Sequence, residues 1–247
     1  MSIALVTGAS AGIGEATARR LDRDGWRVVL VARREDRLRE LAGSLKDASY
    51  VAADLTEEGA PGRVREHVEG LGELHLLVNN AGRSRRAPFG DREEGGYALV
   101  REVMDLNFDA VVRLTEELLP LVRQSAPSAI VNVGSIAGRV GQPRSGAYNA
   151  SKFALAGWTE ALRFEERRHG VHVGLVLPGY ISTEGFPQEQ LMSSARTRWT
   201  VSTPDKVADA IVRAATKRKP EVHVPRPWAA VPRLRAMAPR LWFRVGG

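Results

Sequence analysis

IALVTGASAGIG, residues 3–14, is the stretch that decides the expected fold of this chain. The aliphatic run at residues 3–6 predicts a short buried strand, and glycines follow it at positions 8, 12 and 14. Glycine lets the backbone turn tightly and approach a pyrophosphate, whose charge the following helix N-terminus stabilises. The G-x3-G-x-G spacing differs from the common G-x-G-x-x-G fingerprint. A plain strand-to-helix turn and a dinucleotide-binding turn both fit, and the position at the first strand and first helix favours the second.

Working outward, similar short apolar runs recur along the chain. They lie at residues 27–32, 49–53, 74–79, 129–134, 171–177 and 221–224. Helical patterns separate them, at 12–25 with a glycine stop at Gly25, at 35–45, at 96–122 and at 148–168. Strands that are apolar on both faces and alternate with helices predict an α/β fold, a Rossmann-type doubly wound parallel sheet flanked by helices on both faces. We expect this catalytic domain to span residues 1–224, followed by a basic C-terminal extension at 225–247.

The composition of the chain excludes several classes of site and of partner. The 247 residues suit one large α/β domain, and the absence of cysteine excludes disulfides, thiolate catalysis and cysteine-based metal sites. No secretory signal is visible, and no apolar run approaches the roughly 20 residues that span a bilayer. We therefore expect a cytoplasmic protein. The net charge is +7, of which the tail carries five arginines, so the nearly balanced body argues against a nucleic-acid partner.

The end of the second strand predicts the cofactor. An NAD-binding fold of this kind places a carboxylate there to bind the ribose 2′-hydroxyl. This chain has Arg33 and Arg34 instead, two guanidiniums that suit a 2′-phosphate. The sequence thus favours NADP (NADPH) over NAD, against the alternative that both arginines begin a solvated helix. This prediction rests on Arg33 and Arg34 alone.

YNASK, residues 148–152, places a tyrosine and a lysine one helical turn apart. Tyrosine is a weak acid with a reference pKa of about 10, and a nearby cation lowers that pKa by stabilising the phenolate. A tuned proton donor is one interpretation of Tyr148 and Lys152. An ordinary exposed helix pair is the other.

The motifs together resemble the short-chain dehydrogenase/reductase family, in its compact single-domain branch. The resemblance rests on TGASAGIG (7–14), ADL (53–55), NNAG (79–82), YNASK (148–152) and PGYIST (178–183), with Asn107 and Ser135, all in the family's order and spacing. It implies Tyr148 as general acid, with Lys152 lowering its pKa and binding the nicotinamide ribose. It also implies that Ser135 holds the substrate oxygen and that Asn107 anchors a proton-relaying water. Ser135 as a strand-end cap and Asn107 as a helix kink are the structural alternatives.

The same resemblance implies a cofactor site without metal. Asp54 is expected near the adenine, or else as the N-cap of a helix that begins near Glu57. Asn79, Asn80 and Gly82 are expected to stabilise the turn beside the cofactor, and Thr183 to bind the carboxamide or pyrophosphate. The predicted cofactor-binding residues are Gly8, Ser10, Gly12, Ile13, Gly14, Arg33, Arg34, Asp54, Leu55, Asn80, Ala81, Gly82, Tyr148, Lys152, Pro178, Gly179, Ile181 and Thr183.

Two further segments leave alternatives open. Arg83, Arg85 and Arg86 follow the NNAG motif, and they form either a solvated loop or a site for an acidic group on a substrate or its carrier. After PGYIST the family has a mobile lid, which predicts an apolar pocket here. An ordinary helix packed on the core fits the same residues, which are Phe186, Leu191, Met192 and Trp199.

The tail is basic and amphipathic. On a helix, one face carries the apolar side chains and the other carries Arg233, Arg240 and Arg244, although Pro239 would kink the middle. Peripheral membrane contact, packing on the domain or a neighbouring subunit, and binding of an acidic carrier protein all fit. The apolar face consists of Val231, Leu234, Met237, Ala238, Leu241 and Trp242.

These observations predict an NADP(H)-dependent oxidoreductase that reduces a ketone or aldehyde, or oxidises the alcohol, by hydride transfer. An apolar lid and an interfacial tail would favour a lipid-like or acyl-chain substrate. The long helices at 96–122 and 148–168 resemble the family's subunit contacts and predict a homodimer or homotetramer. The alternative is a non-catalytic dinucleotide-binding scaffold or redox sensor, held at a membrane or partner by its tail.

Overall fold

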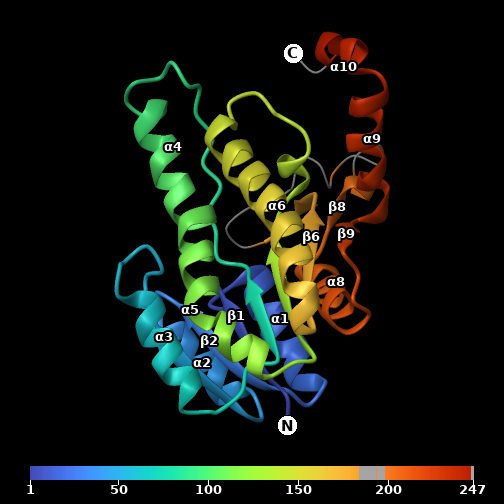
Figure 1. The fold of residues 1–247 in the computed structure, drawn as a ribbon. Coiled ribbons are helices and arrows are strands. Elements are labelled where there is room, and N and C mark those ends of the chain that lie inside the picture. Colours follow the sequence, from blue (N-terminus) through green and yellow to red (C-terminus); the bar gives the residue numbers. More distant parts are fainter. Residues whose placement is uncertain (184–192, 194–197, 246–247) are drawn as a thin grey trace.

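A computed structural model describes residues 1–183, 193 and 198–245 of the chain (Figure 1). Its centre is a seven-stranded parallel sheet with the order β3-β2-β1-β4-β5-β6-β9. The predicted fold class is therefore confirmed, and all seven expected strands are present within two residues of their predicted bounds. The strands are β1 Ile3–Thr7, β2 Arg27–Ala32, β3 Ala48–Ala52, β4 Leu76–Asn79, β5 Ser128–Val133, β6 Val171–Pro178 and β9 Glu221–Val224.

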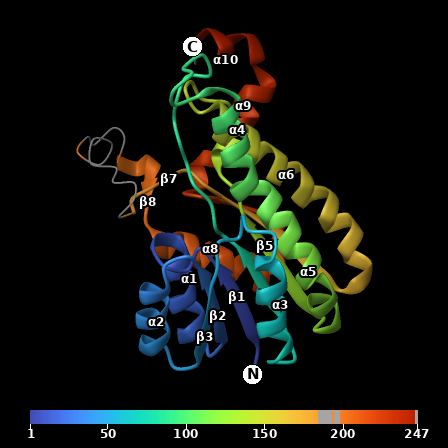
Figure 2. The same ribbon diagram turned by 90° about the vertical axis from the view of Figure 1, so that its left-hand side faces the viewer.

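Helices cover both faces of this sheet (Figure 2). One face is covered by α1 Gly12–Arg23, α2 Glu35–Ser44 and α8 Pro204–Thr216, and the other by α3 Ala60–Glu69, α5 Ala110–Gln124 and α6 Gly146–Glu166. A further helix, α4 Gly96–Met104, packs against α6.

Two hydrophobic cores explain why the strands read as continuous apolar runs. On β1, Ala4 and Val6 are buried in the core that contains α1, α2 and α8. The intervening residues Ile3 and Leu5 are buried in the core on the opposite face. Side chains of a strand alternate between faces, so a strand covered on both sides needs apolar residues at every position.

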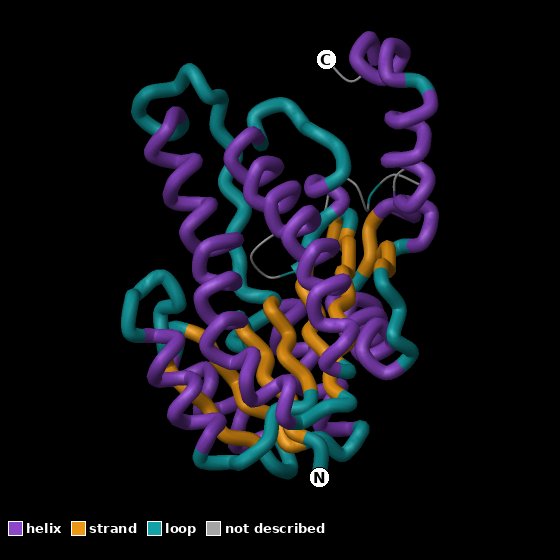
Figure 3. The backbone as a smooth tube through the Cα atoms, viewed as in Figure 1, coloured by secondary structure: helices purple, strands orange, loops and turns teal. Residues whose placement is uncertain are grey.

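The order of the strands places a crevice at the carboxyl end of the sheet. Strand β1 pairs with β2 on one side and with β4 on the other, so the chain reverses its winding direction between β1 and β4. Ligands of open parallel sheets bind outside the carboxyl ends of the strands at this position. The residues that follow β1, β4, β5 and β6 all meet there, although they are far apart in sequence (Figure 3).

Two predicted helices are interrupted. The helix expected at 96–122 is α4 and α5 joined by a π-helical turn at Asp105–Asp109. The tail is likewise two short helices, α9 Ala230–Met237 and α10 Pro239–Val245, because Pro239 cannot continue a helix and instead begins one. Two short strands, β7 Tyr180–Ile181 and β8 Val201–Ser202, form a separate pair. None of the described helices is both long and apolar enough to cross a membrane.

Candidate active site

A cavity of about 510 Å³ lies at the carboxyl end of the sheet. Its walls come from the loops after β1, β2, β3, β4, β5 and β6 and from the first turns of α6. Ser135, Tyr148 and Lys152 line it, as do all the predicted cofactor-binding residues except Gly14. Gly14 and Asn107 do not line the cavity themselves. Each packs against residues that do, Gly14 against Gly8 and Asn107 against Arg83.

The glycine turn is held open by backbone geometry. Gly8 and Gly12 have φ angles of +66° and +58°, a conformation that other residues adopt only at a cost. A Cβ on Gly14 would lie 2.7 Å from the Gly8 carbonyl carbon, so only glycine fits against the turn. The N-cap residue of α1, Ala11, makes no side-chain cap, which leaves the first N–H groups of α1 available to an anion.

Residues after β4 fasten this turn. The Asn80 side-chain amide donates to the Thr7 carbonyl at 2.8 Å, and the Thr7 hydroxyl accepts from the Asn80 and Ala81 N–H groups, each at 2.9 Å. Asn79 is buried, and its amide nitrogen donates to Asn132 and Thr115. Both asparagines therefore stabilise the two loops beside the cavity, as the sequence predicted.

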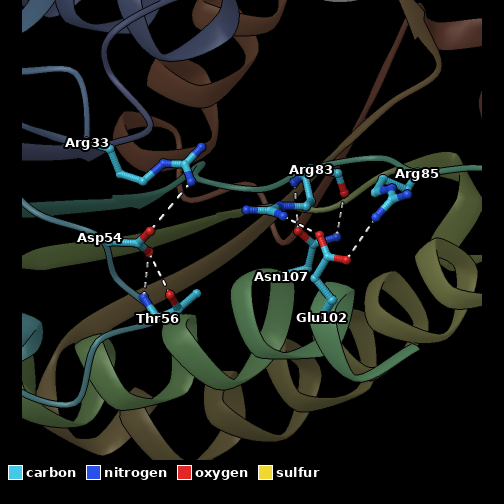
Figure 4. A network of polar contacts seen from close by, with 7 residues as sticks. All are labelled: Arg33, Asp54, Thr56, Arg83, Arg85, Glu102 and Asn107. Atoms are coloured by element: carbon cyan, nitrogen blue, oxygen red, sulfur yellow. Dashed lines mark hydrogen bonds and ion pairs between the residues drawn. The ribbon is translucent and has the colours of Figure 1, made fainter. Parts of the chain in front are cut away.

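Arg33 and Arg34 lie at the end of β2 and line the far end of the cavity. Arg34 donates to the hydroxyl and carbonyl oxygens of Ser10 in the glycine turn, at 3.1–3.2 Å. Arg33 pairs with Asp54 at 3.5 Å across the mouth (Figure 4). This ion pair lies at the surface and is weak, so a bound phosphate could replace Asp54 as the partner of Arg33.

Asp54 follows β3 and does not cap a helix. Its carboxylate accepts from the Thr56 N–H at 3.0 Å and the Thr56 hydroxyl at 2.7 Å, whereas the next helix, α3, begins only at Ala60. The N-cap interpretation was therefore wrong, because Asp54 closes a local turn instead. Burial raises the pKa of Asp54, but the bonds from Thr56 and the charge of Arg33 outweigh it and hold that pKa below its usual value.

The candidate catalytic residues meet at the other end of the cavity. Ser135 follows β5, and its hydroxyl accepts from the Ala137 N–H at 3.1 Å and donates to the Pro178 carbonyl at 3.4 Å. Tyr148 lies in the first turn of α6, and Ser135 is near enough to its phenol to lower the pKa of that group. Ser135 thus caps a short turn and also lines the cavity, so the cap does not exclude the predicted contact with a substrate oxygen.

The pKa of Tyr148 differs from the expectation. Burial raises it, and contact with Ser135 and the charge of Arg86 oppose this rise without cancelling it. The Lys152 ammonium lies 5.9 Å from the centre of the Tyr148 ring and donates to the Val133 carbonyl at 2.9 Å. The expected lowering by Lys152 is therefore not found in this pocket, because the ammonium is directed at a backbone oxygen and desolvation dominates.

Lys152 itself is 5% exposed, and burial lowers its pKa to about 8. Between this value and the unfolded value near 10.4 the unfolded chain binds more protons, so stability rises with pH. We expect the unfolding free energy of the cofactor-free protein to rise by about 2–3 kcal/mol between pH 8 and 10.5, relative to a Lys152→Met variant. Denaturant unfolding of both proteins across this range measures it. Parallel curves would show that Lys152 is not desolvated.

Asn107 lies in the π-helical turn and is fully buried. Its side chain accepts from the Arg83 N–H at 2.8 Å and donates to the Arg83 carbonyl at 2.9 Å (Figure 4). It also donates to the Ser151 hydroxyl at 3.0 Å. Asn107 therefore ties the loop after β4 to α6. The extra residue of the π turn directs this amide inward, and such turns are frequent at functional sites.

The three arginines after the NNAG motif have different surroundings. Arg83 and Arg85 both form ion pairs with Glu102 of α4, the second at 3.0 Å (Figure 4). Arg86 lines the cavity beside Tyr148. The single carboxylate of Glu102 balances one of these two charges, and Arg85 remains exposed, so the solvated-loop interpretation still fits this part of the loop.

The turn after β6 brings Pro178, Gly179, Ile181 and Thr183 to the cavity wall. A tail residue that the sequence did not single out supports it: Trp228 donates its indole N–H to the Thr200 carbonyl at 3.0 Å and packs edge-to-face on Tyr180. A Cβ on Gly179 would clash with the indole ring of Trp228. No local pattern marks Trp228, because its role exists only where the tail meets the turn.

Gln142 also lines the cavity and was not predicted. Its N–H donates to the Asn149 side chain at 3.1 Å, which fixes the loop before α6. Of the predicted lid, Phe186, Leu191 and Met192 lie outside the described residues, as does the side chain of Trp199.

These features fit a dinucleotide. One end of the cavity contains a glycine turn with no room for a Cβ, an uncapped helix N-terminus and two arginines. A buried lysine and a tyrosine–serine pair lie at the other. The first set can hold phosphates, and the second can bind a carbonyl oxygen and deliver a proton to it.

Comparisons with known proteins agree with this geometry. The family model described as short chain dehydrogenase matches residues 2–192. The ketoacyl reductase HetN of Nostoc sp. is 32% identical over 225 residues, which cover 89% of this chain and 77% of HetN.

Solved structures are similar over nearly the whole chain. The RhlG–NADP active-site complex of Pseudomonas aeruginosa superposes with a TM-score of 0.78 at 29% identity, covering 90% of this chain and 93% of RhlG. A variant of actinorhodin polyketide ketoreductase with NADPH superposes with a TM-score of 0.79 at 28% identity, covering 92% and 97%.

Proposed function

The chain belongs to the short-chain dehydrogenase family, and from this premise we propose that it is an enzyme that uses NADPH to reduce a ketone or aldehyde, or NADP to oxidise the alcohol. Family members bind a nicotinamide dinucleotide and act on alcohol or carbonyl groups of small molecules. The observation that carries the proposal is the convergence of Ser135, Tyr148 and Lys152 on one wall of a cavity whose far end holds Arg33 and Arg34. The NADP and NADPH complexes of two similar structures support the choice of cofactor.

Reduction requires a group that binds the carbonyl oxygen and gives it a proton. NADPH supplies the hydride when it is bound. The Ser135 hydroxyl and the Tyr148 phenol line the same cavity, and both could donate to one substrate oxygen. As negative charge develops on that oxygen, the Tyr148 proton passes to it. A raised pKa keeps Tyr148 protonated until substrate arrives.

Lys152 has a separate role. Its ammonium is bound by the Val133 carbonyl, next to the Gly82 backbone. A ribose hydroxyl placed there could share this donor, since an ammonium has three N–H groups. Phosphates bound near Gly12 and Arg34 and the developing phenolate would both favour the charged form of Lys152. We therefore expect the pKa of Lys152 to rise when cofactor binds.

Arg33 and Arg34 are proposed to select the 2′-phosphate. We expect Arg33→Ala with Arg34→Ala to weaken NADPH binding by about 10- to 100-fold and to leave NADH binding nearly unchanged, because each charge-assisted hydrogen bond contributes roughly 1.5–3 kcal/mol, partly offset by breaking existing contacts. Nicotinamide fluorescence titration with both cofactors measures this.

A matched control is available on the helix that follows these arginines. Arg39 of α2 is exposed, pairs with Glu35 and does not line the cavity, so Arg39→Ala should change neither affinity. Equal losses of NADPH and NADH binding in the double variant would indicate general damage to the site. Unchanged NADPH binding would show that the arginines do not contact the phosphate.

We further propose a lipid-like or acyl-chain carbonyl substrate and a homo-oligomeric assembly. The similarity to a protein named ketoacyl reductase supports the first point. Exposed Phe164 on α6 supports the second, because large apolar side chains on a long helix favour contact with another subunit. The competing function, a non-catalytic dinucleotide-binding scaffold, predicts cofactor binding without turnover of any ketone or alcohol in a broad panel. Turnover of one carbonyl compound by the wild-type protein would exclude it.

A further inference from the structure

The outer surface of the tail helices exposes large apolar side chains. Leu234 and Met237 of α9 are 58% and 83% exposed, and Phe243 of α10 is 69% exposed. Figure 1 shows both helices standing beside and beyond the carboxyl end of the sheet, with α10 at the extremity of the molecule. The tail is two short helices, so the single helix with an apolar and a basic face that the sequence predicted does not form. Arg233, Arg240 and Arg244 are exposed next to these residues in sequence, and we call the six residues together the tail face. Clustered exposed apolar groups rimmed by charge mark an interaction surface.

The charge of the tail face has one sign. Residues 225–247 contain five arginines and no acidic residue. Among the described residues, Arg233, Arg240 and Arg244 form no ion pair or side-chain hydrogen bond, and all three are exposed. The remaining surface contains many arginines that are paired with carboxylates, such as Arg65 with Glu69. The tail face is therefore a positive surface that the protein does not neutralise itself.

The tail helices are held in place from their inner side. Arg235 of α9 donates to the Arg139 carbonyl at 3.0 Å, and its guanidinium lies 5.9 Å from the centre of the Phe153 ring. Trp228, just before α9, is locked against Tyr180 and Thr200. The inner side of the tail thus contacts the protein body. Leu234 and Met237 remain exposed, and Phe243 is largely exposed although it also borders the groove between the tail and the body.

We propose that the tail face docks on a bilayer that contains anionic lipid. Apolar side chains interleaved with arginines match an interface in which acyl chains meet acidic headgroups. A second copy of this chain fits less well, because a symmetric contact through the tail face would bring arginine against arginine. The docking does not depend on the proposed reaction.

The position of the tail face connects docking with the catalytic cavity. A groove of about 380 Å³ lies between the tail and the body, and its walls include Pro143, Phe153, Trp242 and Phe243. Gln142 lines both this groove and the catalytic cavity. Docking of the tail would therefore place this groove at the bilayer surface. Because the groove borders the catalytic cavity, a lipid-like carbonyl compound in the bilayer could reach the cavity through it.

Co-sedimentation of the full chain with vesicles tests the proposal. We expect binding to vesicles of phosphatidylcholine with phosphatidylserine, weaker binding in high salt, and little binding to pure phosphatidylcholine. The triple change Leu234→Ser, Met237→Ser and Phe243→Ser should lower the partition coefficient at least about 10-fold. The triple change of Arg233, Arg240 and Arg244 to Gln should do the same.

The control is Phe89→Ser in the loop before α4, which removes an aromatic ring of similar exposure, 74%, outside the tail. It should bind vesicles like the wild type. NADPH binding verifies that each variant is folded, and point changes are preferable to truncation at Pro225, which would also remove Trp228. Absence of vesicle binding, or binding that both triple variants retain, would overturn the proposal. Light scattering tests the alternative of a subunit contact. If the triple variants change the oligomeric mass and the wild-type protein does not bind vesicles, the proposal is also overturned.

Discussion

Replacing Tyr148 by phenylalanine should lower kcat about 10²- to 10⁴-fold while NADPH still binds, because the variant loses only the proton donor. The phenol lies at the catalytic end of the cavity, against Ser135 and away from Arg33 and Arg34, so cofactor affinity should depend little on it. The aromatic ring that fills the wall is retained. Steady-state reduction of a ketone found by screening measures kcat, and fluorescence titration measures binding.

A second tyrosine provides the control. Tyr97 of α4 is exposed and does not line the cavity, so Tyr97→Phe should keep wild-type turnover. Wild-type turnover by Tyr148→Phe would show that another group protonates the substrate. A loss of NADPH binding in the variant would mean instead that the hydroxyl helps to position the cofactor.

Replacing Gly14 by alanine should weaken NADPH binding at least about 100-fold, because the backbone that holds the pyrophosphate must move. The new Cβ would lie 2.7 Å from the Gly8 carbonyl carbon and 2.8 Å from the Asn80 side-chain nitrogen. Neither neighbour can yield easily, since Gly8 has φ +66° and Asn80 is bonded to Thr7. Overpacking of this kind also costs about 1–3 kcal/mol of stability, so the melting temperature should fall.

Gly62 offers a matched control. It lies in α3, and a Cβ added there would meet nothing within 4 Å, so Gly62→Ala should preserve NADPH binding and raise stability slightly. Titration and thermal unfolding of both variants provide the comparison. A Gly14→Ala protein that binds NADPH normally would show that the turn does not pack around a pyrophosphate as proposed.

The strands and the glycine turn could be predicted because their signals are local. A strand covered on both faces needs an unbroken apolar run, and each of the seven runs formed a strand. The positive φ angles of Gly8 and Gly12 follow from turn geometry within a few residues. The bounds of the helix predicted at 96–122 were less accurate. A π-helical turn that contains Asn107 interrupts it, and the helical pattern of the sequence does not show this turn.

Pairings between distant residues could not be predicted in the same way. Arg33 meets Asp54, Arg83 and Arg85 share Glu102, and Trp228 supports the turn at Gly179. Each contact joins segments that the strand order brings together, and no local pattern encodes which side chain will be opposite which. This is why the three arginines after the NNAG motif looked equivalent in the sequence and are not.

The sequence by itself determined the sheet, the order of the elements along the chain, the family, and which residues line the cavity, because periodic burial and turn chemistry are properties of short segments. Only the tertiary structure decided the electrostatic state of those residues. The pKa of Tyr148 rises and that of Lys152 falls to about 8 because the fold removes both from water and directs the Lys152 ammonium at the Val133 carbonyl. Desolvation depends on everything packed around a group, and that packing exists only once the chain has folded.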